Sequence, residues 1–269
     1  MSVLISVDEL RELPEVVLLD VRWMLGGPPG HQEYRTGHIP GAVFVDLETE
    51  LAAHGEPTDG RHPLPSLPAL QASARRWGVR EDVPVVAYDG NGNLAAARAW
   101  WLLRWAGVPD VRLLDGALAA WVTAGGDLDV DDVVPEPSDI VLTGGELPTL
   151  DLDAVQGFDG VLLDARAGER YRGETEPIDP KAGHIPGATS APTTENLAPD
   201  GRFLDPGALR ERFSSLGVGA GPTGVYCGSG VTAAHEIAAL AIAGYDAALY
   251  AGSWSQWSNH DELPVATGK

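Results

Sequence analysis

Cys227 is the only cysteine among 269 residues, and its surroundings favour a reactive thiolate. It lies in the segment 225–232, Val-Tyr-Cys-Gly-Ser-Gly-Val-Thr, between an apolar run and an alanine-rich stretch with helical periodicity. A thiolate there would face the backbone N–H groups of a tight loop and the positive end of the following helix, and both stabilise the anion. Gly228 and Gly230 permit a positive φ and the close approach of a ligand. We therefore predict that Cys227 is a nucleophile rather than an inert core residue.

The composition is that of an ordinary globular protein, and its charge argues against nucleic acid or an anionic membrane as a partner. Hydrophobic residues make up 44% of the chain and charged residues 21%, which allows a substantial core. The formal net charge of −21 argues against partners that are bound through clustered lysine and arginine. No apolar run approaches the roughly 18 residues of a membrane span, and the N-terminus lacks the pattern of a signal peptide. With one cysteine there is no internal disulfide, so we expect a cytoplasmic location, where a reactive thiol stays reduced.

The same charge limits how an anionic substrate can be bound. Lys181 and Lys269 are the only lysines, so arginine must supply nearly all of the positive potential at a site. We therefore expect an arginine close to Cys227 in space.

Four sequence features occur twice and in the same order. Val-Leu-Leu-Asp-Val-Arg at 17–22 returns as Val-Leu-Leu-Asp-Ala-Arg at 161–166, and Gly-His-Ile-Pro-Gly-Ala at 37–42 returns at 183–188. Asp89 ends an apolar run where Cys227 ends its counterpart, and Gly116 with Trp121 corresponds to Gly252 with Trp257. This repetition predicts two copies of one domain, at 1–128 and 149–269. The intervening stretch, 129–148, is rich in Asp, Glu, Pro and Gly and is typical of a linker.

Within each copy, short apolar runs alternate with helical patterns, which predicts an α/β fold with a mostly parallel sheet covered by helices. Ser6 with Glu9 three residues later indicates a helix N-terminus. Ligands in such folds bind beyond the carboxyl ends of strands, where Cys227 lies. The predicted strands are 16–20, 42–46, 85–88 and 111–114, then 161–164, 224–226 and 246–250, and the predicted helices are 6–13, 66–77, 93–106 and 116–124, then 206–216 and 231–243.

The two copies differ at the position of the nucleophile. Asp89-Gly90-Asn91-Gly92 keeps the glycines of the loop but offers no sulfur. We therefore predict that the first domain is catalytically inactive and that the second carries the chemistry.

The ordered motifs, the doubled domain, the loop 227–232 and the segment Gly-Ser-Trp-Ser-Gln-Trp at 252–257 resemble a known family. They are similar to the tandem-domain sulfurtransferases of the rhodanese and 3-mercaptopyruvate sulfurtransferase family, over nearly the whole chain. The resemblance implies two rhodanese-like domains, an inactive first and an active second, and transfer of a sulfane sulfur through a cysteine persulfide.

This family mechanism suits the loop around Cys227. The thiolate would attack the sulfur of a small anionic donor, thiosulfate or 3-mercaptopyruvate. The backbone N–H groups of the following residues would hold the anionic persulfide. Cyanide or a thiol, such as that of a thioredoxin-like protein, would then accept the outer sulfur, and no metal or organic cofactor is required. The residues expected to form this loop are Gly228, Ser229, Gly230, Val231 and Thr232.

The resemblance also assigns Arg170, in Arg-Tyr-Arg-Gly at 170–173, to the negative charge of the donor. Arg166 belongs to the repeated Asp-x-Arg motif, and because Arg22 is its copy in the inactive domain, we interpret it as structural. Mercaptopyruvate enzymes usually carry a second arginine in a Pro-Glu-Pro-Arg stretch, whereas this chain has Glu-Thr-Glu-Pro-Ile-Asp at 174–179. The Gly-Ser-Gly-Val-Thr loop nevertheless resembles that branch, so the preferred donor stays open between thiosulfate and 3-mercaptopyruvate.

Ser229 and a histidine of the first domain, here His38, are candidates for proton transfer in the mercaptopyruvate branch. The motif that contains His38 recurs around His184, so a role in stabilising a turn is an equal alternative for both histidines.

The sequence offers three alternatives to a sulfurtransferase. A phosphatase of the Cys-x5-Arg type is disfavoured because the sixth residue after Cys227 is Ala233. A metal site built from His31, His38, His54 and His62 is disfavoured by their irregular spacing and the lack of thiolate partners. A non-enzymatic persulfide carrier, in which Cys227 accepts sulfur from a partner protein, remains the alternative to an enzyme.

Overall fold

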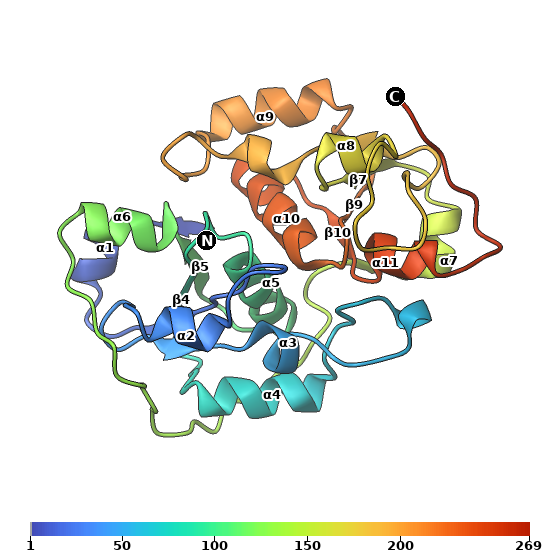
Figure 1. Cartoon of the computed structure of the whole chain (residues 1–269). Coiled ribbons are helices and arrows are strands. Elements are labelled where there is room, and N and C mark those ends of the chain that lie inside the picture. Colours follow the sequence, from blue (N-terminus) through green and yellow to red (C-terminus); the bar gives the residue numbers. More distant parts are fainter. Residues whose placement is uncertain (1) are drawn as a thin grey trace. The chain divides into compact units, whose positions relative to one another are not determined.

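A computed structural model describes residues 2–269, and the chain divides into two compact units (Figure 1). The first unit contains the residues up to Ala53, Pro65–Leu147 and Pro199–Phe203. The second contains His54–Leu64, Pro148–Ala198 and Leu204–Lys269. The segment 54–64, which the repeat assigns to the first copy, therefore packs within the second unit.

The first unit is built on a parallel sheet of five strands in the order β1-β5-β4-β2-β3. All four residues of the central strand β4 are buried, as expected where helices cover both faces of a parallel sheet. The strands are β1 Leu4–Ile5, β2 Val17–Asp20, β3 Val43–Phe44, β4 Val85–Tyr88 and β5 Val111–Leu114. The helices are α1 Val7–Glu12, α2 Gly30–Tyr34, α3 Leu47–Glu50, α4 Leu67–Arg76, α5 Ala96–Trp105 and α6 Ala117–Thr123.

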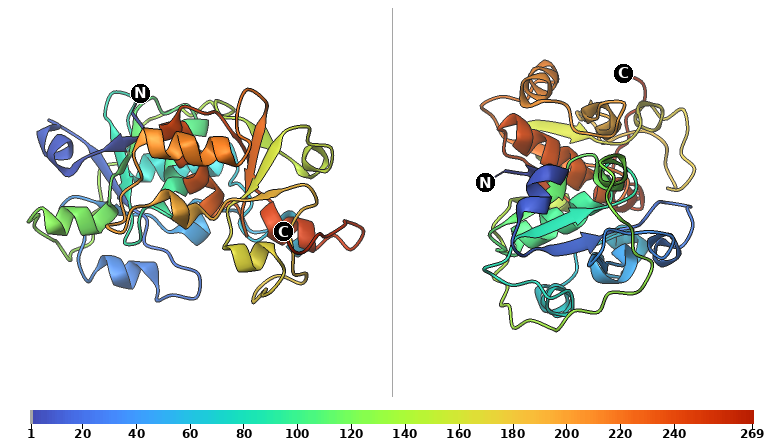
Figure 2. Two further views of the ribbon diagram at one scale, coloured as in Figure 1. Left: turned by 90° about the horizontal axis from the view of Figure 1, so that it is seen from above. Right: turned by 90° about the vertical axis from the view of Figure 1, so that its left-hand side faces the viewer.

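The second unit repeats this topology, with the parallel order β6-β10-β9-β7-β8. The long helix α10 packs on β9 and β10 and against α9 (Figures 1 and 2). The strands are β6 Thr149–Leu150, β7 Val161–Asp164, β8 Thr189–Ser190, β9 Thr223–Tyr226 and β10 Ala248–Tyr250. The helices are α7 Leu152–Gln156, α8 Gly168–Tyr171, α9 Pro206–Ser215, α10 Val231–Ala243 and α11 Ser253–Ser258, with 3₁₀ turns at η1 Pro57–Asp59 and η2 Thr193–Asn196.

The predicted fold class is confirmed, and the matching strand orders confirm the repeat. The pairing register agrees as well, because Leu19 lies opposite Val43 in the first sheet and Leu163 lies opposite Thr189 in the second. The predicted helix start at Ser6 is also confirmed: its side chain accepts from the Glu9 N–H, while the Glu9 carboxylate accepts from the Ser6 N–H.

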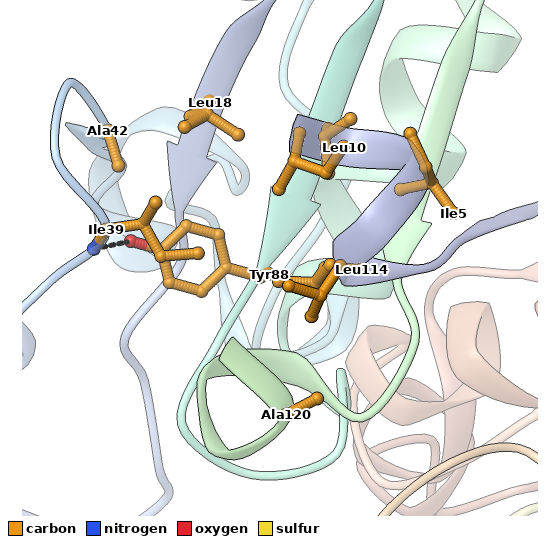
Figure 3. Close-up of a cluster of buried hydrophobic side chains, with 10 residues drawn as sticks. Ile5, Leu10, Leu18, Ile39, Ala42, Tyr88, Leu114 and Ala120 are labelled. Atoms are coloured by element: carbon orange, nitrogen blue, oxygen red, sulfur yellow. Dashed lines mark hydrogen bonds between the residues drawn. The ribbon is translucent and has the colours of Figure 1, made fainter. Parts of the chain in front are cut away.

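The core of the first unit lies between its sheet and the covering helices (Figure 3). Tyr88 of β4 is fully buried there, and its hydroxyl accepts a hydrogen bond of 2.9 Å from the Ile39 N–H. In the second unit Tyr226 of β9 accepts from the Ile185 N–H at 3.2 Å. The repeated His-Ile-Pro turn is thus tied to the same central strand in both copies.

The stretch 129–148 forms no helix or strand in the described chain, and it is fixed to the first unit by hydrogen bonds. Asp129 forms an isolated antiparallel bridge with His38. Further along, the Thr143 N–H donates to the Ala106 carbonyl and the Glu146 N–H to the Trp105 carbonyl, each at 3.0 Å.

Candidate active site

Cys227 lies directly after β9, at the carboxyl end of the central strand of the second sheet. Its side chain is only 2% exposed, and the Gly230 N–H donates to its Sγ at 3.1 Å. Gly230 has a φ of +78°, and a Cβ there would lie 2.5 Å from the Ala251 carbonyl oxygen. Only glycine fits this turn, which aims a backbone N–H at the sulfur.

The turn that follows β10 holds the cysteine loop by its backbone. The Cys227 N–H donates to Ser253 Oγ at 3.1 Å, and the Trp254 N–H donates to the Cys227 carbonyl at 2.9 Å. The Ser255 N–H donates to the Gly228 carbonyl, also at 2.9 Å. Ser253 adopts a φ of +55°, an uncommon conformation for a residue with a side chain, which its hydroxyl stabilises by donating to the Tyr250 carbonyl. The loop is therefore preorganised.

Ser229 contacts a histidine that the sequence did not single out for catalysis. Its Oγ lies 2.7 Å from His62 Nδ1, and both side chains are buried. His62 belongs to the segment 54–64, which lies against α11: the Arg61 N–H donates to Ser255 Oγ at 3.0 Å, and Gln256 Nε2 donates to the Thr58 carbonyl at 3.1 Å. From the sequence, Ser229 was expected in this loop, whereas His62 was considered only as a candidate metal ligand.

Two guanidinium groups lie beside the loop. A Cβ built on Gly228 would lie 3.4 Å from Arg170 Nη1 and 3.3 Å from Arg61 Nη2. Arg170 is in α8, as its motif predicts, and Arg61 again comes from the segment 54–64. The expected arginine near Cys227 is thus present, together with a second one that the sequence did not indicate.

Two buried carboxylates hold these arginines. Glu176 accepts from Arg170 Nε and Nη2 at 3.2 and 2.6 Å. Asp179 bridges the pair, with Oδ1 2.5 Å from Arg61 Nη1 and Oδ2 3.2 Å from Arg170 Nη2. Burial raises the pKa of Asp179, and the attraction of Arg61 offsets part of that rise. With both carboxylates ionised, the four charges sum to zero.

Arg166 has a structural environment, in keeping with its interpretation from the repeat. Its guanidinium binds Asp164 through Nε and Nη2, donates to the Gly183 carbonyl and lies 4.6 Å from the centre of the Trp254 ring. Burial acts to lower the pKa of Arg166, but the hydrogen bonds to Asp164 and the attraction of Asp164, Tyr226 and Glu176 together outweigh it, so that the pKa is raised. Arg166 therefore stays charged and fastens β7 to the turn before β8.

The loop of the first unit has the same frame but a different occupant. The Leu118 N–H donates to the Asp89 carbonyl, just as the Trp254 N–H donates to that of Cys227, so the two residues are equivalent. The Asp89 carboxylate is buried and accepts four backbone N–H groups, at 2.7 to 3.1 Å. Burial raises the pKa of Asp89, and these hydrogen bonds counteract the rise. The donors are the N–H groups of Asn91, Asn93, Ala95 and Ala96.

His38 lies in the first unit, where it makes the same contacts as His184 in the second. His38 Nδ1 is 3.0 Å from the Tyr34 carbonyl and its ring stacks on Tyr34 at 3.8 Å. His184 Nδ1 is 2.8 Å from the Tyr171 carbonyl and stacks on Tyr171 at 3.7 Å. This duplication favours the turn-stabilising alternative for both histidines.

Within residues 2–269 there is no group of three or more His, Cys, Asp or Glu side chains placed to hold a metal ion. Over the same residues, none of the helices has the length and hydrophobicity needed to cross a bilayer.

Known proteins resemble this chain over nearly its full length. The rhodanese-like domain family matches residues 6–124 and 150–260. The putative thiosulfate sulfurtransferase SseB of Mycobacterium tuberculosis is 50% identical, over 99% of this chain and 98% of the relative. A probable 3-mercaptopyruvate sulfurtransferase of Pseudomonas aeruginosa is 48% identical, over 95% of this chain and 93% of the relative. The crystal structure of SseA from Escherichia coli superimposes with a TM-score of 0.84 at 33% identity, over 94% of this chain and 99% of that one.

Proposed function

Because this chain belongs to the rhodanese-like family, with two copies of the domain, we propose that it is a sulfurtransferase that works through a Cys227 persulfide and prefers 3-mercaptopyruvate as its donor. The observation that carries the choice of donor is the 2.7 Å contact between Ser229 Oγ and His62 Nδ1 beside the nucleophile.

The first half-reaction makes the persulfide. The Cys227 thiolate attacks the sulfur of 3-mercaptopyruvate, an S–S bond forms, and the C–S bond breaks with its electron pair going to the leaving carbon as the enolate of pyruvate. The proton of the donor thiol then moves to that carbon, which leaves pyruvate and an anionic persulfide. In the second half-reaction the outer sulfur passes to cyanide, giving thiocyanate, or to a thiol, giving a new persulfide, and the Cys227 thiolate returns.

The Ser229–His62 pair suits this donor because its reaction moves a proton and that of thiosulfate does not. Thiosulfate leaves as sulfite, without gaining or losing hydrogen. The enolate of pyruvate must be protonated, and a hydroxyl bonded to an imidazole can take the thiol proton and return it to carbon. Ser229 lies two residues from Cys227 in the same loop, so the relay adjoins the bond that breaks.

The loop of the first unit supports the predicted persulfide cradle. There the same backbone frame already holds an acidic group, the side chain of Asp89, on four N–H groups. In the second unit the Gly230 N–H points at the sulfur, and no side chain caps the start of α10. We infer that the N–H groups of Gly228 to Thr232 receive the persulfide in the same way.

In this proposal the first domain is inactive because the side chain of its own Asp89 occupies the loop N–H groups. Asp89 supplies no nucleophile and occupies the N–H groups that would hold a transferred sulfur. A thiol acceptor, for which a thioredoxin-like protein is our candidate, and a reducing cytoplasmic setting complete the proposal.

The test compares the two donors on the intact chain. After incubation with 3-mercaptopyruvate or thiosulfate, mass spectrometry should find one added sulfur on Cys227, and addition of cyanide should yield thiocyanate. We expect kcat/KM to be higher for 3-mercaptopyruvate than for thiosulfate. Turnover retained by Cys227→Ser would refute the mechanism, a preference for thiosulfate would refute the choice of donor, and a persulfide that no acceptor discharges would favour the carrier alternative.

A further inference from the structure

A pocket of about 380 Å³ opens in the first unit onto the apolar cluster of Figure 3, a volume in the range of small-molecule sites. Leu10 of α1, Leu18 of β2 and Ile39 of the repeated turn line it and belong to the cluster (Figure 3). The pocket therefore leads to the core of the unit. Its apolar lining residues are Leu10, Val16, Leu18, Ile39, Pro40 and Trp121.

In the second unit a leucine side chain packs against the counterparts of these residues. Trp257 and Ile185 correspond to Trp121 and Ile39, and both belong to one buried cluster with Leu263. Leu263 is 8% exposed and Trp257 2%. The second copy thus covers its tryptophan and isoleucine with a side chain of its own.

The chain makes the same backbone contacts after both tryptophans. Trp121 Nε1 donates to the Asp127 carbonyl at 2.8 Å, and Trp257 Nε1 donates to the Pro264 carbonyl at 2.9 Å. In each copy, the residue two positions after this carbonyl forms the isolated bridge to the histidine of the repeated turn. The two segments can therefore be compared residue by residue.

The first copy has glycine where the second has the covering leucine. Leu263 precedes the acceptor carbonyl in the second copy, and Gly126 precedes it in the first. A Cβ on Gly126 would lie 2.2 Å from the Trp121 ring, so the ring itself excludes a side chain at this position. Trp121 is consequently only partly buried. An apolar ligand that covers Trp121 would remove this surface from water, which is favourable.

One cation lies at the edge of the pocket. Arg11 lines it with its Cζ 5.1 Å from the centre of the Trp121 ring, and its Nη2 donates to the Ala124 carbonyl at 3.0 Å. Its ion pair with Asp8 is long, at 3.8 Å, and Asp8 is 92% exposed, so this charge is weakly compensated. Asp127 also lines the pocket, where its carbonyl accepts from Trp121. A ligand carboxylate can thus pair with Arg11 beside the apolar wall.

We propose that this pocket is a ligand site for a small apolar monoacid, whose hydrophobic ring or branched chain covers Trp121 while its single acid group pairs with Arg11. The site is separate from the donor site at Cys227, and the assignment does not depend on the sulfurtransferase activity.

The probe is 3-phenylpropionate, a benzene ring on a short chain that ends in one carboxylate, and its neutral counterpart is 3-phenylpropanol. Each is titrated into the full chain and followed by the NMR signal of the Trp121 indole N–H, which a spectrum of Trp121→Phe identifies. We expect saturable binding of the acid with a dissociation constant of about 1 mM or lower, as suits a ligand of this size. The alcohol should bind about fivefold more weakly, the effect of one exposed ion pair.

Val16→Phe and Arg11→Gln test the two halves of the assignment. Val16 lines the pocket and is partly buried, so a phenylalanine there fills the space and should raise the dissociation constant of the acid at least about tenfold. Arg11→Gln should weaken the acid to the level of the alcohol and leave the alcohol within about twofold of its wild-type value. Because Arg11 is 39% exposed, this variant keeps the test valid should Val16→Phe fail to fold.

Val134→Phe and Arg80→Gln are the matched controls. Val134 is 88% exposed and Arg80 45%, and neither lines the pocket. Both variants should bind the acid like the wild type, and thermal melting of all four checks the fold.

The assignment is overturned if the acid does not bind, or if neither Val16→Phe nor Arg11→Gln weakens it. A dissociation constant that responds to Arg170→Ala but not to these variants would place the probe at the donor site and also overturn it. Failure of the probe to bind, together with dimerisation of the wild type that Val16→Phe abolishes, would assign the pocket to a second copy of the chain instead. No turnover is measured, so a failure of the proposed sulfur transfer would leave these results unchanged.

Discussion

Substitution of Ser229 by alanine separates proton transfer from sulfur attack within one loop. Ser229→Ala removes only the Oγ that lies 2.7 Å from His62 Nδ1. The backbone N–H of residue 229 remains, and so do Gly230 N–H and its 3.1 Å contact with the sulfur. The variant should therefore keep its persulfide cradle and lose its relay.

The expected size follows from the burial of the pair. Ser229 is 6% exposed and His62 3%, so bulk water cannot readily replace the missing hydroxyl. General acid–base catalysis by a positioned group contributes about 10²- to 10⁴-fold. We expect a loss of about 10²-fold in kcat/KM for 3-mercaptopyruvate, equivalent to about 2.7 kcal/mol. For thiosulfate, whose reaction moves no proton, the change should stay within about threefold, well under 1 kcal/mol.

The assay measures kcat/KM for both donors with cyanide as acceptor, and the ratio of the two is the result. Ser215→Ala, which removes an exposed hydroxyl at the end of α9, is the matched control and should leave the ratio unchanged. His62→Gln should reproduce the effect of Ser229→Ala, and the double variant should be no worse than either alone, because the two side chains act as one unit. Equal losses for both donors would refute the relay, as would an unaffected 3-mercaptopyruvate reaction.

Three further substitutions test the fold and the loop. Asp89→Asn puts an amide NH₂ against two of the four N–H groups that Asp89 binds; chemical denaturation should show a loss of about 2 to 4 kcal/mol in unfolding free energy with sulfur transfer by the folded protein unchanged, and loss of transfer would contradict an inactive first domain. Burial raises the pKa of Glu236 to about 7 from its ordinary 4.5, against the attraction of Arg212. Because the pKa of Glu236 is higher in the folded state than in the unfolded state, its contribution to the unfolding free energy, on the order of 3 kcal/mol, is complete below about pH 4.5 and disappears as the pH rises through 7. Glu236→Gln should lack this pH dependence of the unfolding free energy between pH 5 and 8. Parallel curves for the wild type and the variant would exclude this contribution of Glu236. Gly230→Ala, with its Cβ 2.5 Å from the Ala251 carbonyl, should displace the N–H from the sulfur and abolish persulfide formation on Cys227 by mass spectrometry, whereas a normal yield would show that this N–H is dispensable.

The sequence predicts those elements whose pattern is long enough to show a period. The runs 85–88, 111–114 and 161–164 are strands at the predicted bounds, and α10 covers the predicted 231–243. β1, β3, β6 and β8 have two residues each, too few to show alternation or helical periodicity. Of these only β3 was predicted, because it lies within the longer apolar run that begins at Ala42. These strands exist because a neighbouring strand pairs with them, and that pairing is tertiary information.

The residues of the candidate site also divide into those that a sequence motif shows and those that only the tertiary structure brings together. Cys227, Gly230 and Ser229 are adjacent in sequence, and their chemistry is visible in the motif. Arg61 and His62 lie beside the loop although more than one hundred residues separate them from it in the sequence, and the family resemblance indicated His38 instead. One signal was present: 53–65 is a long stretch without helical or strand pattern that contains an arginine and two histidines, and long irregular segments in compact domains are often functional.

The segment 54–64 also explains what the first copy contributes although its own loop has no nucleophile. The N–H groups of that loop donate to the carboxylate of Asp89, which stabilises the backbone and leaves none of these groups for a transferred sulfur. The segment 54–64 of the same copy, which contains Arg61 and His62, packs in the second unit. A domain made only of residues 149–269 would keep Cys227 and its loop but neither of these side chains. The pairing of two copies in one chain is therefore a requirement of the proposed site, because the second sheet positions the nucleophile while a segment of the first copy supplies the second guanidinium and the relay imidazole.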